Sequence, residues 1–378
     1  MERSVYITST GAFLPGEPVP SPEMEQYIGK VSEKRSRLGR LVLRQNGIKT
    51  RHYALSQQGE PLHTSAQMAA RAIQDALQQS ELAESKLTFL SAATTQGDLL
   101  VPGFASSVHG ELGIGPMEIA SFQSVCASGM MAAKSAYLQI KAGEHASGVA
   151  CAAEFSSRFF RPGFYADIDV DEDDNTALME TEFLRWTLSD GAGAWLMESR
   201  PNEGAGRRSL RVEWVDLCSY GDRFESCMFG GTATNRPETQ KPWSHYESPA
   251  RAASAGAIVL RQDFELLYRL FPVWVKHYLE LLDRRRLDPR SVTHFLAHYS
   301  SQSLRAEMIK LLERTGAMVP EERWFSNLTS QGNVGAASIF LMLDKLRRER
   351  PLEPGDKILC FVPESGRCVI AFMLLTVV

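Results

Sequence analysis

Three residues of this 378-residue chain have the chemical types and settings that nucleophilic catalysis needs. Cys126 lies in "SFQSVCASGMMAAKSAYLQIKAG", at the expected start of a helix rich in small residues. A helix N-terminus offers free N–H groups and the positive end of the dipole, which lower the pKa of a thiol and favour the nucleophilic thiolate. The alternative is an inert, packed cysteine, because buried free cysteines are common.

A histidine and an asparagine are the partners that would make Cys126 catalytic. In "VTHFLAHYSSQS", His298 follows an alternating strand, and ligands of α/β sheets lie at the carboxyl ends of strands. In "SQGNVGAAS", Asn333 stands between glycines at an expected helix start, where it can cap the helix and still point its amide at a substrate. The alternatives are a satisfied loop histidine and a simple N-cap.

The order Cys, His, Asn also occurs in papain-like proteases. Here His298 follows Cys126 by 172 residues and Asn333 follows it by 207. Both separations exceed the roughly 130–150 residues of that family, and its sequence context around the cysteine is missing. A protease is therefore not expected.

The elements that must position these residues form two similar series. Each half has a polar residue followed by a helix, a turn and a buried strand, so an internal duplication is the natural interpretation, although unrelated βα units also look alike. Under duplication, Cys126 and Asn333 would be symmetry mates facing each other at the centre of the molecule. The expected helices are 63–80, 127–141 and 333–350, and the expected strands are 4–14, 86–95, 147–155, 193–198, 292–297, 357–362 and 369–377.

Composition narrows the class of protein. The length favours two lobes, and 44% hydrophobic with 23% charged residues is typical of a globular protein. A net charge of −4 gives no reason to expect nucleic acid or an anionic membrane as partner.

The six irregularly spaced cysteines predict no metal site, and the acidic stretch 167–175 lacks the Gly and Glu of a calcium loop. With no expected signal peptide or membrane span, the sequence predicts a soluble cytoplasmic protein.

Six segments in order resemble the ketoacyl-acyl carrier protein synthase III group of the thiolase superfamily. The resemblance implies an α/β fold of the thiolase-like five-layered αβαβα type with two pseudo-symmetric lobes, and a homodimer. Residues 1–200 would form the lobe with Cys126, and residues 201–378 the lobe with His298 and Asn333. The segments are "NGIKTRH" (46–52), "AATTQGDLLVPGFASSVHGELGI" (92–114), "VCASGMMAA", "SDGAGAWLM" (189–197), "FLAHYS" and "SQGNVGAAS".

The resemblance also implies a condensation reaction between two acyl thioesters, carried by an acyl carrier protein or coenzyme A. Cys126 would accept the first acyl group, and His298 and Asn333 would hold the carbonyl oxygen of the second, each neutral donor contributing about 3 kcal/mol. The backbone N–H of Cys126 and of Gly366 would hold the other oxyanion. No metal or redox cofactor is implied.

Departures from the family pattern predict an unusual substrate. Leu41 and Gln45 replace the Trp and Arg that bind the adenine of coenzyme A in fatty-acid-initiating members. Arg37, Arg40 and Arg44 would suit an acidic carrier protein, although such charge runs usually form a solvated face.

New charges also stand near the expected site, namely Glu154, Glu364 and Arg367. Of these, Glu154 is either a general base or a paired structural charge, with the latter favoured. The pattern is most similar to ketosynthases that form dialkylresorcinols or cyclohexanediones. The alternatives are an acyltransferase forming an ester or amide, and a non-catalytic partner subunit, which would be expected to lose Cys126 or His298.

Overall fold

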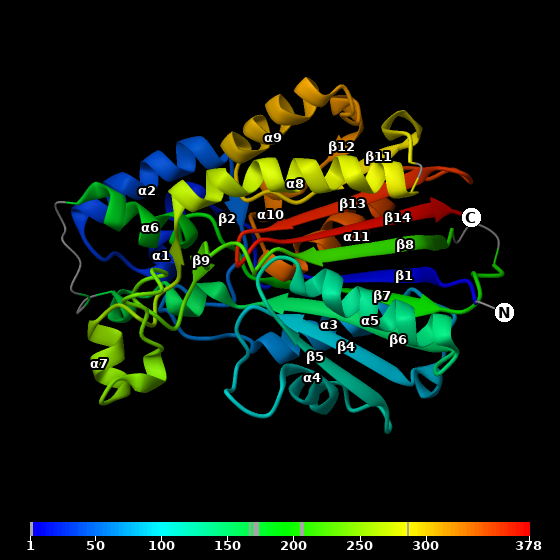
Figure 1. The fold of residues 1–378 in the computed structure, drawn as a ribbon. Helices are drawn as coiled ribbons and strands as arrows, with labels where there is room; N and C mark the ends of the chain where they lie inside the picture. The colour runs from blue at the N-terminus through cyan, green and yellow to red at the C-terminus, as the bar shows by residue number, and fades with distance from the viewer. Residues whose placement is uncertain (1–2, 166–167, 169–173, 205–207, 286) are drawn as a thin grey trace.

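The computed structural model describes residues 3–165, 168, 174–204, 208–285 and 287–378, so most of the acidic stretch 167–175 lies outside the described residues. Ten strands form one hydrogen-bonded sheet in the order β12-β11-β13-β14-β8-β1-β7-β6-β4-β5. Both termini lie at the same end of this sheet (Figure 1). In the part of the chain that is described, no helix is long and apolar enough to cross a membrane.

The strand order is the same in the two halves of the chain. From its edge strand inward, the first half reads β5-β4-β6-β7-β1 and the second reads β12-β11-β13-β14-β8. The halves join where β1 pairs antiparallel with β8 through Tyr6 and Ile7. The strands are β1 (Tyr6–Phe13), β4 (Phe89–Thr94), β5 (Glu118–Gln123), β6 (Ser147–Glu154), β7 (Gly191–Glu198), β8 (Leu210–Ser219), β11 (His294–Ala297), β12 (Trp324–Phe325), β13 (Lys357–Glu364) and β14 (Val369–Val377).

Three helices in each half complete the duplication and create the layers. The first half carries α3 (Ser65–Gln78), α4 (Phe104–Leu112) and α5 (Ser128–Ala142). The second half carries α8 (Phe264–Arg285), α9 (Gln302–Thr315) and α11 (Ser338–Glu349) in the same positions between strands. Helices α8 and α9 cover one outer face (Figure 1), while α5 and α11 share one hydrophobic core with the inner faces of the strands. The predicted fold class is confirmed.

The central strands are buried on both faces, as strands between helical layers must be. In β13, Ile358, Cys360 and Val362 face the central core with α5 and α11, whereas Leu359 and Phe361 face the outer core under α8 and α9. This alternation follows the two-residue period of a strand. It explains why the sequence shows continuous apolar runs here.

Local signals in the sequence set several boundaries. The Thr64 side chain caps α3, and the Gln67 side chain returns the bond in a capping box. Helix α5 ends at Gly143, which has a φ of 90°, and Ser301 caps α9. The predicted helices 63–80 and 127–141 are confirmed within two residues.

The remaining elements are insertions around this duplicated frame. A two-stranded ribbon, β9 with β10, and α7 lie between β8 and α8. The strands outside the main sheet are β2 (Val19–Pro20), β3 (Thr50–Arg51), β9 (Met228–Phe229) and β10 (Arg261–Gln262). The further helices are α1 (Glu25–Ile28), α2 (Glu33–Asn46), α6 (Asn175–Arg185), α7 (Pro249–Ser254) and α10 (Leu328–Gln331). The 3₁₀ turns are η1 (Ser21–Glu23), η2 (Glu84–Lys86), η3 (Ser156–Phe159), η4 (Pro162–Phe164), η5 (Trp243–His245), η6 (Pro289–Ser291), η7 (Glu321–Arg323) and η8 (Gly335–Ala337).

The predicted helix start at Asn333 is wrong. Helix α11 begins at Ser338 after the 3₁₀ turn η8, because Gly335 has a φ of 49° and breaks the helical path. Helices α5 and α11 begin 210 positions apart, at Ser128 and Ser338. That offset pairs Cys126 with residue 336, so Asn333 lies three residues before its symmetry position. The proposed boundary between residues 200 and 201 stays a prediction.

Candidate functional site

The turn between β5 and α5 places Cys126 at the centre of the molecule. Ser128 N donates to Val125 O at 3.1 Å, and the Ser128 hydroxyl donates to the same oxygen at 2.8 Å. These bonds tighten the turn, and Ala127 becomes the N-cap of α5. The Cys126 side chain therefore lies just before the helix and is 8% exposed.

The expected lowering of the Cys126 pKa is wrong. Burial raises the pKa of this thiol, and the Glu364 and Glu154 carboxylates raise it further. Ala127 N donates to Glu364 Oε2 at 2.8 Å, so a carboxylate already lies at the positive end of α5. The dipole that would favour a thiolate is thus offset by this neighbouring carboxyl group, and the pKa of the thiol is raised rather than lowered.

His298 lies directly after β11, at the carboxyl end of the strand, as predicted. Its backbone N–H donates to Phe361 O at 2.8 Å, which fixes the residue against β13. Burial lowers the pKa of His298 to about 4, so the imidazole is neutral near pH 7. Neither ring nitrogen has a hydrogen-bond partner among the described residues, and the side chain lines a cavity.

Asn333 is held by its backbone and by its side-chain oxygen. Its carbonyl oxygen accepts from Ser189 N at 2.8 Å, and its Oδ1 accepts from Gly335 N at 2.9 Å. Within the described chain, Nδ2 has no partner and the side chain lines the same cavity as His298. The amide therefore keeps N–H donors without a partner beside the cavity, and its binding of a ligand stays a prediction.

One cavity brings the three predicted residues together, since Cys126, His298 and Asn333 all line it. Its other walls are mostly apolar and include large side chains from α8 and α9. The sequence did not reveal these walls, although the helical spacing of Leu267, Phe271 and Trp274 in α8 was a usable signal. The apolar walls are Leu184, Met228, Leu267, Phe271, Trp274, Ala297, Leu304, Met308, Trp324, Phe361 and Pro363.

A close backbone approach holds the two helix beginnings together. A Cβ atom added to Gly129 would lie 2.3 Å from Ala336 O and 2.8 Å from the Phe340 ring. Only a glycine fits there, so the first turn of α5 rests directly on η8. The prediction that the two helix starts face each other is confirmed, although Cys126 and Asn333 are not symmetry mates.

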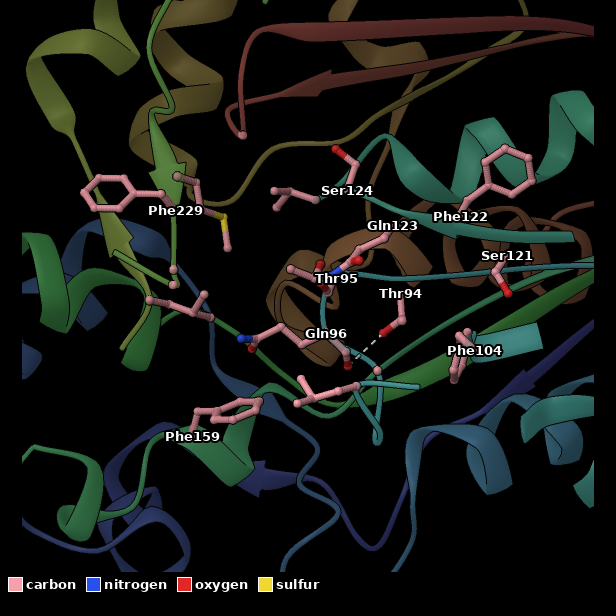
Figure 2. Close-up of a pocket in the computed structure, with 18 of the residues that line it drawn as sticks. Thr94, Thr95, Gln96, Phe104, Ser121, Phe122, Gln123, Ser124, Phe159 and Phe229 are labelled. Atoms are coloured by element: carbon pink, nitrogen blue, oxygen red, sulfur yellow. Dashed lines mark hydrogen bonds between the residues drawn. The ribbon is translucent and has the colours of Figure 1, made fainter. Parts of the chain in front are cut away.

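An open groove adjoins the cavity and shares Met228 with it (Figure 2). Phenylalanine side chains lie at both ends of the groove, with Phe159 and Phe229 at one end and Phe104 at the other. Gln123 lies beside Thr95 between them, where its Nε2 donates to Thr95 O at 3.4 Å.

The auxiliary residues predicted from the sequence lie outside the cavity. Gly366 and Arg367 line the groove, and Arg367 Nε donates to Phe224 O at 2.8 Å. Glu154 lines neither space and binds backbone and hydroxyl groups instead. Gly366 packs against Val125, since an added Cβ would meet Val125 Cγ2 at 2.7 Å. Its role as a second oxyanion donor stays a prediction.

Two further sequence motifs hold the backbone next to Asn333. In "SDGAGAWLM", Asp190 accepts from Ala54 N at 2.8 Å and from Ser157 N at 3.0 Å, and its own N–H donates to His52 O. The preceding residue, Ser189, holds Asn333 through the bond described above. The "NGIKTRH" segment and this motif thus form one frame behind the asparagine.

Comparisons with known proteins agree with this arrangement. Residues 282–373 match the model of the family described as 3-Oxoacyl-[acyl-carrier-protein (ACP)] synthase III C terminal. The chain is 24% identical over 361 residues to the beta-ketoacyl-[acyl-carrier-protein] synthase III of Oleidesulfovibrio alaskensis, and the match covers 95% of each chain.

Solved structures share the fold over nearly the full length. The tetronic acid condensing enzyme AbyA1 has a TM-score of 0.75 at 20% identity, covering 98% of this chain and 99% of the other. OleA from Xanthomonas campestris, solved as a single-residue variant, has a TM-score of 0.76 at 17% identity, covering 99% and 97%.

The chain therefore has the fold of known condensing enzymes, the tetronic acid condensing enzyme AbyA1 among them. Its sequence is similar over nearly its full length to beta-ketoacyl-[acyl-carrier-protein] synthase III enzymes, and its C-terminal part matches the synthase III family model.

Proposed function

We propose that the first half-reaction transfers an acyl group to Cys126. The Cys126 sulfur attacks the carbonyl carbon of an acyl thioester, its proton leaves, and the carrier departs as a free thiol. His298 is a neutral imidazole in the same cavity and can accept the proton during the attack, which a buried, protonated thiol requires. One thioester bond forms and one breaks, so the step is nearly balanced in energy.

The second half-reaction forms a carbon–carbon bond. A malonyl-type thioester loses carbon dioxide and leaves an electron pair on its α-carbon, or a β-ketoacyl thioester loses a proton there. His298 and Asn333 Nδ2 donate to the enolate oxygen, the kind of preorganised donors worth about 3 kcal/mol each. The carbanion attacks the acyl carbon, and the Cys126 sulfur leaves as a thiolate. It takes up the proton lost by the β-ketoacyl thioester or, in the malonyl route, a proton from water.

The observation that carries this proposal is the single cavity that joins the three polar groups to apolar walls. Walls of Phe, Trp, Leu and Met suit the apolar part of an acyl group. Together with the departures in the sequence, they support a role in specialised lipid or polyketide biosynthesis, with dialkylresorcinol or cyclohexanedione formation as the specific proposal.

The proposed carrier of the acyl groups is an acidic acyl carrier protein. Arg37, Arg40 and Arg44 lie on the exposed side of α2, at the i, i+3 and i+7 spacing that puts them on one face. The end of α2 adjoins α9, since an added Cβ on Gly47 would meet Gln302 Cγ at 2.4 Å. Helix α9 in turn supplies cavity walls, so a carrier docked on this stripe would lie near the site.

The proposed assembly is a homodimer built on the edge strand β5. Strand β5 pairs only with β4 among the described strands, and Ile119 on it is 37% exposed. Nearby in the chain, Leu99, Leu100 and Val101 are 59%, 85% and 80% exposed. Unpaired strand edges and exposed apolar side chains both favour association with a second copy. Sedimentation equilibrium of the wild type tests the dimer.

Weighing the protein after each half-reaction tests the proposal. The wild type is incubated with acyl thioesters of increasing length on a carrier protein or on coenzyme A, and its intact mass is measured. The acylated protein then receives malonyl and β-ketoacyl thioesters or hydroxylated and amine acceptors. A new carbon–carbon bond in the product supports the proposal; an ester or amide product, or no acylation, contradicts it.

A further inference from the structure

Two buried glutamates end equivalent strands in the two halves of the molecule. Glu154 is the last residue of β6, Glu364 is the last residue of β13, and they are 2% and 1% exposed. In the described part of the chain, neither carboxylate forms an ion pair. A buried carboxylate without a cation is costly unless hydrogen bonds satisfy it, so the partners of these two groups must be strong ones.

Glu364, from the second half, holds the nucleophile turn of the first half. Its Oε2 accepts from Ala127 N at 2.8 Å, and its Oε1 accepts from the Ser124 hydroxyl at 2.6 Å. These two donors flank Val125 and Cys126 in the chain. The carboxylate therefore fixes both sides of the turn that carries the sulfur.

Glu154, from the first half, holds the opposite turn in the second half. Its Oε1 accepts from Ala336 N at 3.2 Å, and it also accepts from Thr95 N at 3.0 Å and the Thr95 hydroxyl at 2.7 Å. Ala336 follows Gly335, whose N–H donates to Asn333 Oδ1. The carboxylate thus fixes the turn that orients the Asn333 amide.

The backbone is shaped around both carboxylates. A Cβ atom on Gly335 would lie 3.1 Å from Glu154 Oε1, and one on Gly366 would lie 2.8 Å from Glu364 Oε1. Neither glutamate lines the cavity, so neither contacts a substrate there. Their role has to be exerted through the residues that they hold.

We propose that Glu364 and Glu154 are positioning residues for different half-reactions, each acting across the internal symmetry on the other half of the chain. Glu364 holds Cys126 for acylation, and Glu154 holds Asn333 for the condensation. The inference rests on the proposed function. Each carboxyl group accepts hydrogen bonds from one turn, and leaving those buried donors unpaired would be costly, which suits the two groups to fix a catalytic turn.

Separate measurements of the two half-reactions test the proposal. The rate of acyl-adduct formation is measured by intact mass, and the rate of bond formation is measured in a single turnover after full acylation. Glu364→Ala is expected to slow acylation at least 10-fold and to leave condensation within about 3-fold. Glu154→Ala is expected to show the reverse. Gln at either position keeps one acceptor oxygen and should recover most of the lost rate.

Control variants keep the outcome interpretable. Glu198 ends β7 and accepts from the Thr8 hydroxyl at 2.6 Å, and Glu198→Gln should change neither rate. If a Glu→Ala protein does not fold, Ser124→Ala and Thr95→Val remove one bond each and should show the same split at smaller size. Equal losses of both rates in the two variants would overturn the inference while leaving the proposed function intact. A wild type that never becomes acylated would overturn both.

Discussion

The beginnings of α5 and α11 are built alike but present different side chains to the cavity. Each helix follows a turn, starts 210 positions from its counterpart, and receives a carboxylate from the opposite half of the chain. The first turn presents a thiol, whereas the second presents an amide whose oxygen is tied and whose nitrogen is free. Asn333 also lies three residues before the symmetry position of Cys126.

That difference shows how a duplicated fold can produce an asymmetric site. The symmetry supplies two helix starts in close contact, through Gly129 on Ala336, and the asymmetry lies in the 3₁₀ turn η8, which precedes α11 and has no counterpart before α5 in the described chain. Asn333 lies just before that turn, and its side chain lines the cavity. The proposed nucleophile and the proposed donor therefore come from similar elements without being equivalent residues.

The largest effect is expected on the rate of condensation when the side-chain amide of Asn333 is removed. Asn333→Ala should lower the rate of condensation by about 10²–10³-fold, because one preorganised donor to the enolate is lost. Acylation of Cys126 should stay within about 3-fold of the wild type, since Nδ2 has no part in that step. Single-turnover product analysis and intact mass measure the two rates. If the Asn333→Ala protein condenses at the wild-type rate, the proposed role of the second turn in condensation is contradicted.

Forcing the two helix starts apart should impair both roles together. Gly129→Ala would place a Cβ 2.3 Å from Ala336 O, so backbone must move, and the free energy of unfolding should fall by about 2–3 kcal/mol. Gly110→Ala is the matched control, because Gly110 lies in α4 with nothing within 4 Å of an added Cβ. The free energy of unfolding of Gly110→Ala should equal that of the wild type or be slightly higher. Urea unfolding compares them; equal stability of the two variants would contradict the close approach.

The acid dependence of stability should reveal the buried neutral imidazole. Because the pKa of His298 is lowered to about 4, the unfolded chain binds this proton near pH 6.5 and the folded chain does not. Stability from this group is present above pH 6.5 and is lost as the pH falls toward 4. The wild type should lose about 2 kcal/mol more than His298→Gln between pH 7 and pH 5.

The side chain of Glu154 also changes protonation in this pH range, so the effect of His298 has to be measured as a difference between the wild type and a variant. Burial raises its pKa to about 7 from a usual 4.5, so its contribution changes with the opposite sign over the same range. Glu154 is present in both the wild type and His298→Gln, so its effect cancels in the difference. Parallel pH profiles for the wild type and His298→Gln would show that this imidazole is not buried and neutral.

The smallest effect is expected at the surface of α2. Reversing three charges (Arg37→Glu, Arg40→Glu and Arg44→Glu together) should slow acylation from an acyl carrier protein about 5–10-fold at low salt, since surface charges mainly steer association. Acylation from the coenzyme A thioester should be unchanged. Reversal of Arg269 and Arg314, which are exposed on α8 and α9, is the control. Equal losses with both donors would remove the docking role.

Much of the frame could be predicted from the sequence because its signals are local. The capping Thr64 with Gln67, the terminal Gly143 and the apolar run of β13 each act within a few residues. The order of the motifs also placed Cys126, His298 and Asn333 in one cavity, as the structure finds.

The remaining features depend on contacts between distant residues. The pKa of Cys126 is raised by burial and by Glu364, 238 positions away in the chain, which a helix-terminus argument cannot foresee. The start of α11 depends on the positive φ of Gly335, and the cavity walls come from α8 and α9. Sequence order does not reveal which of these segments meet.

Locating the acyl group on the protein tests the central claim most directly. The wild type is incubated with an acyl thioester, digested, and the modified peptide is identified by fragmentation, with Cys126→Ala as the paired sample. The account predicts one acyl group on Cys126 and none on the variant, although five other cysteines remain. An acyl group on another residue, or equal acylation of the Cys126→Ala protein, would contradict it.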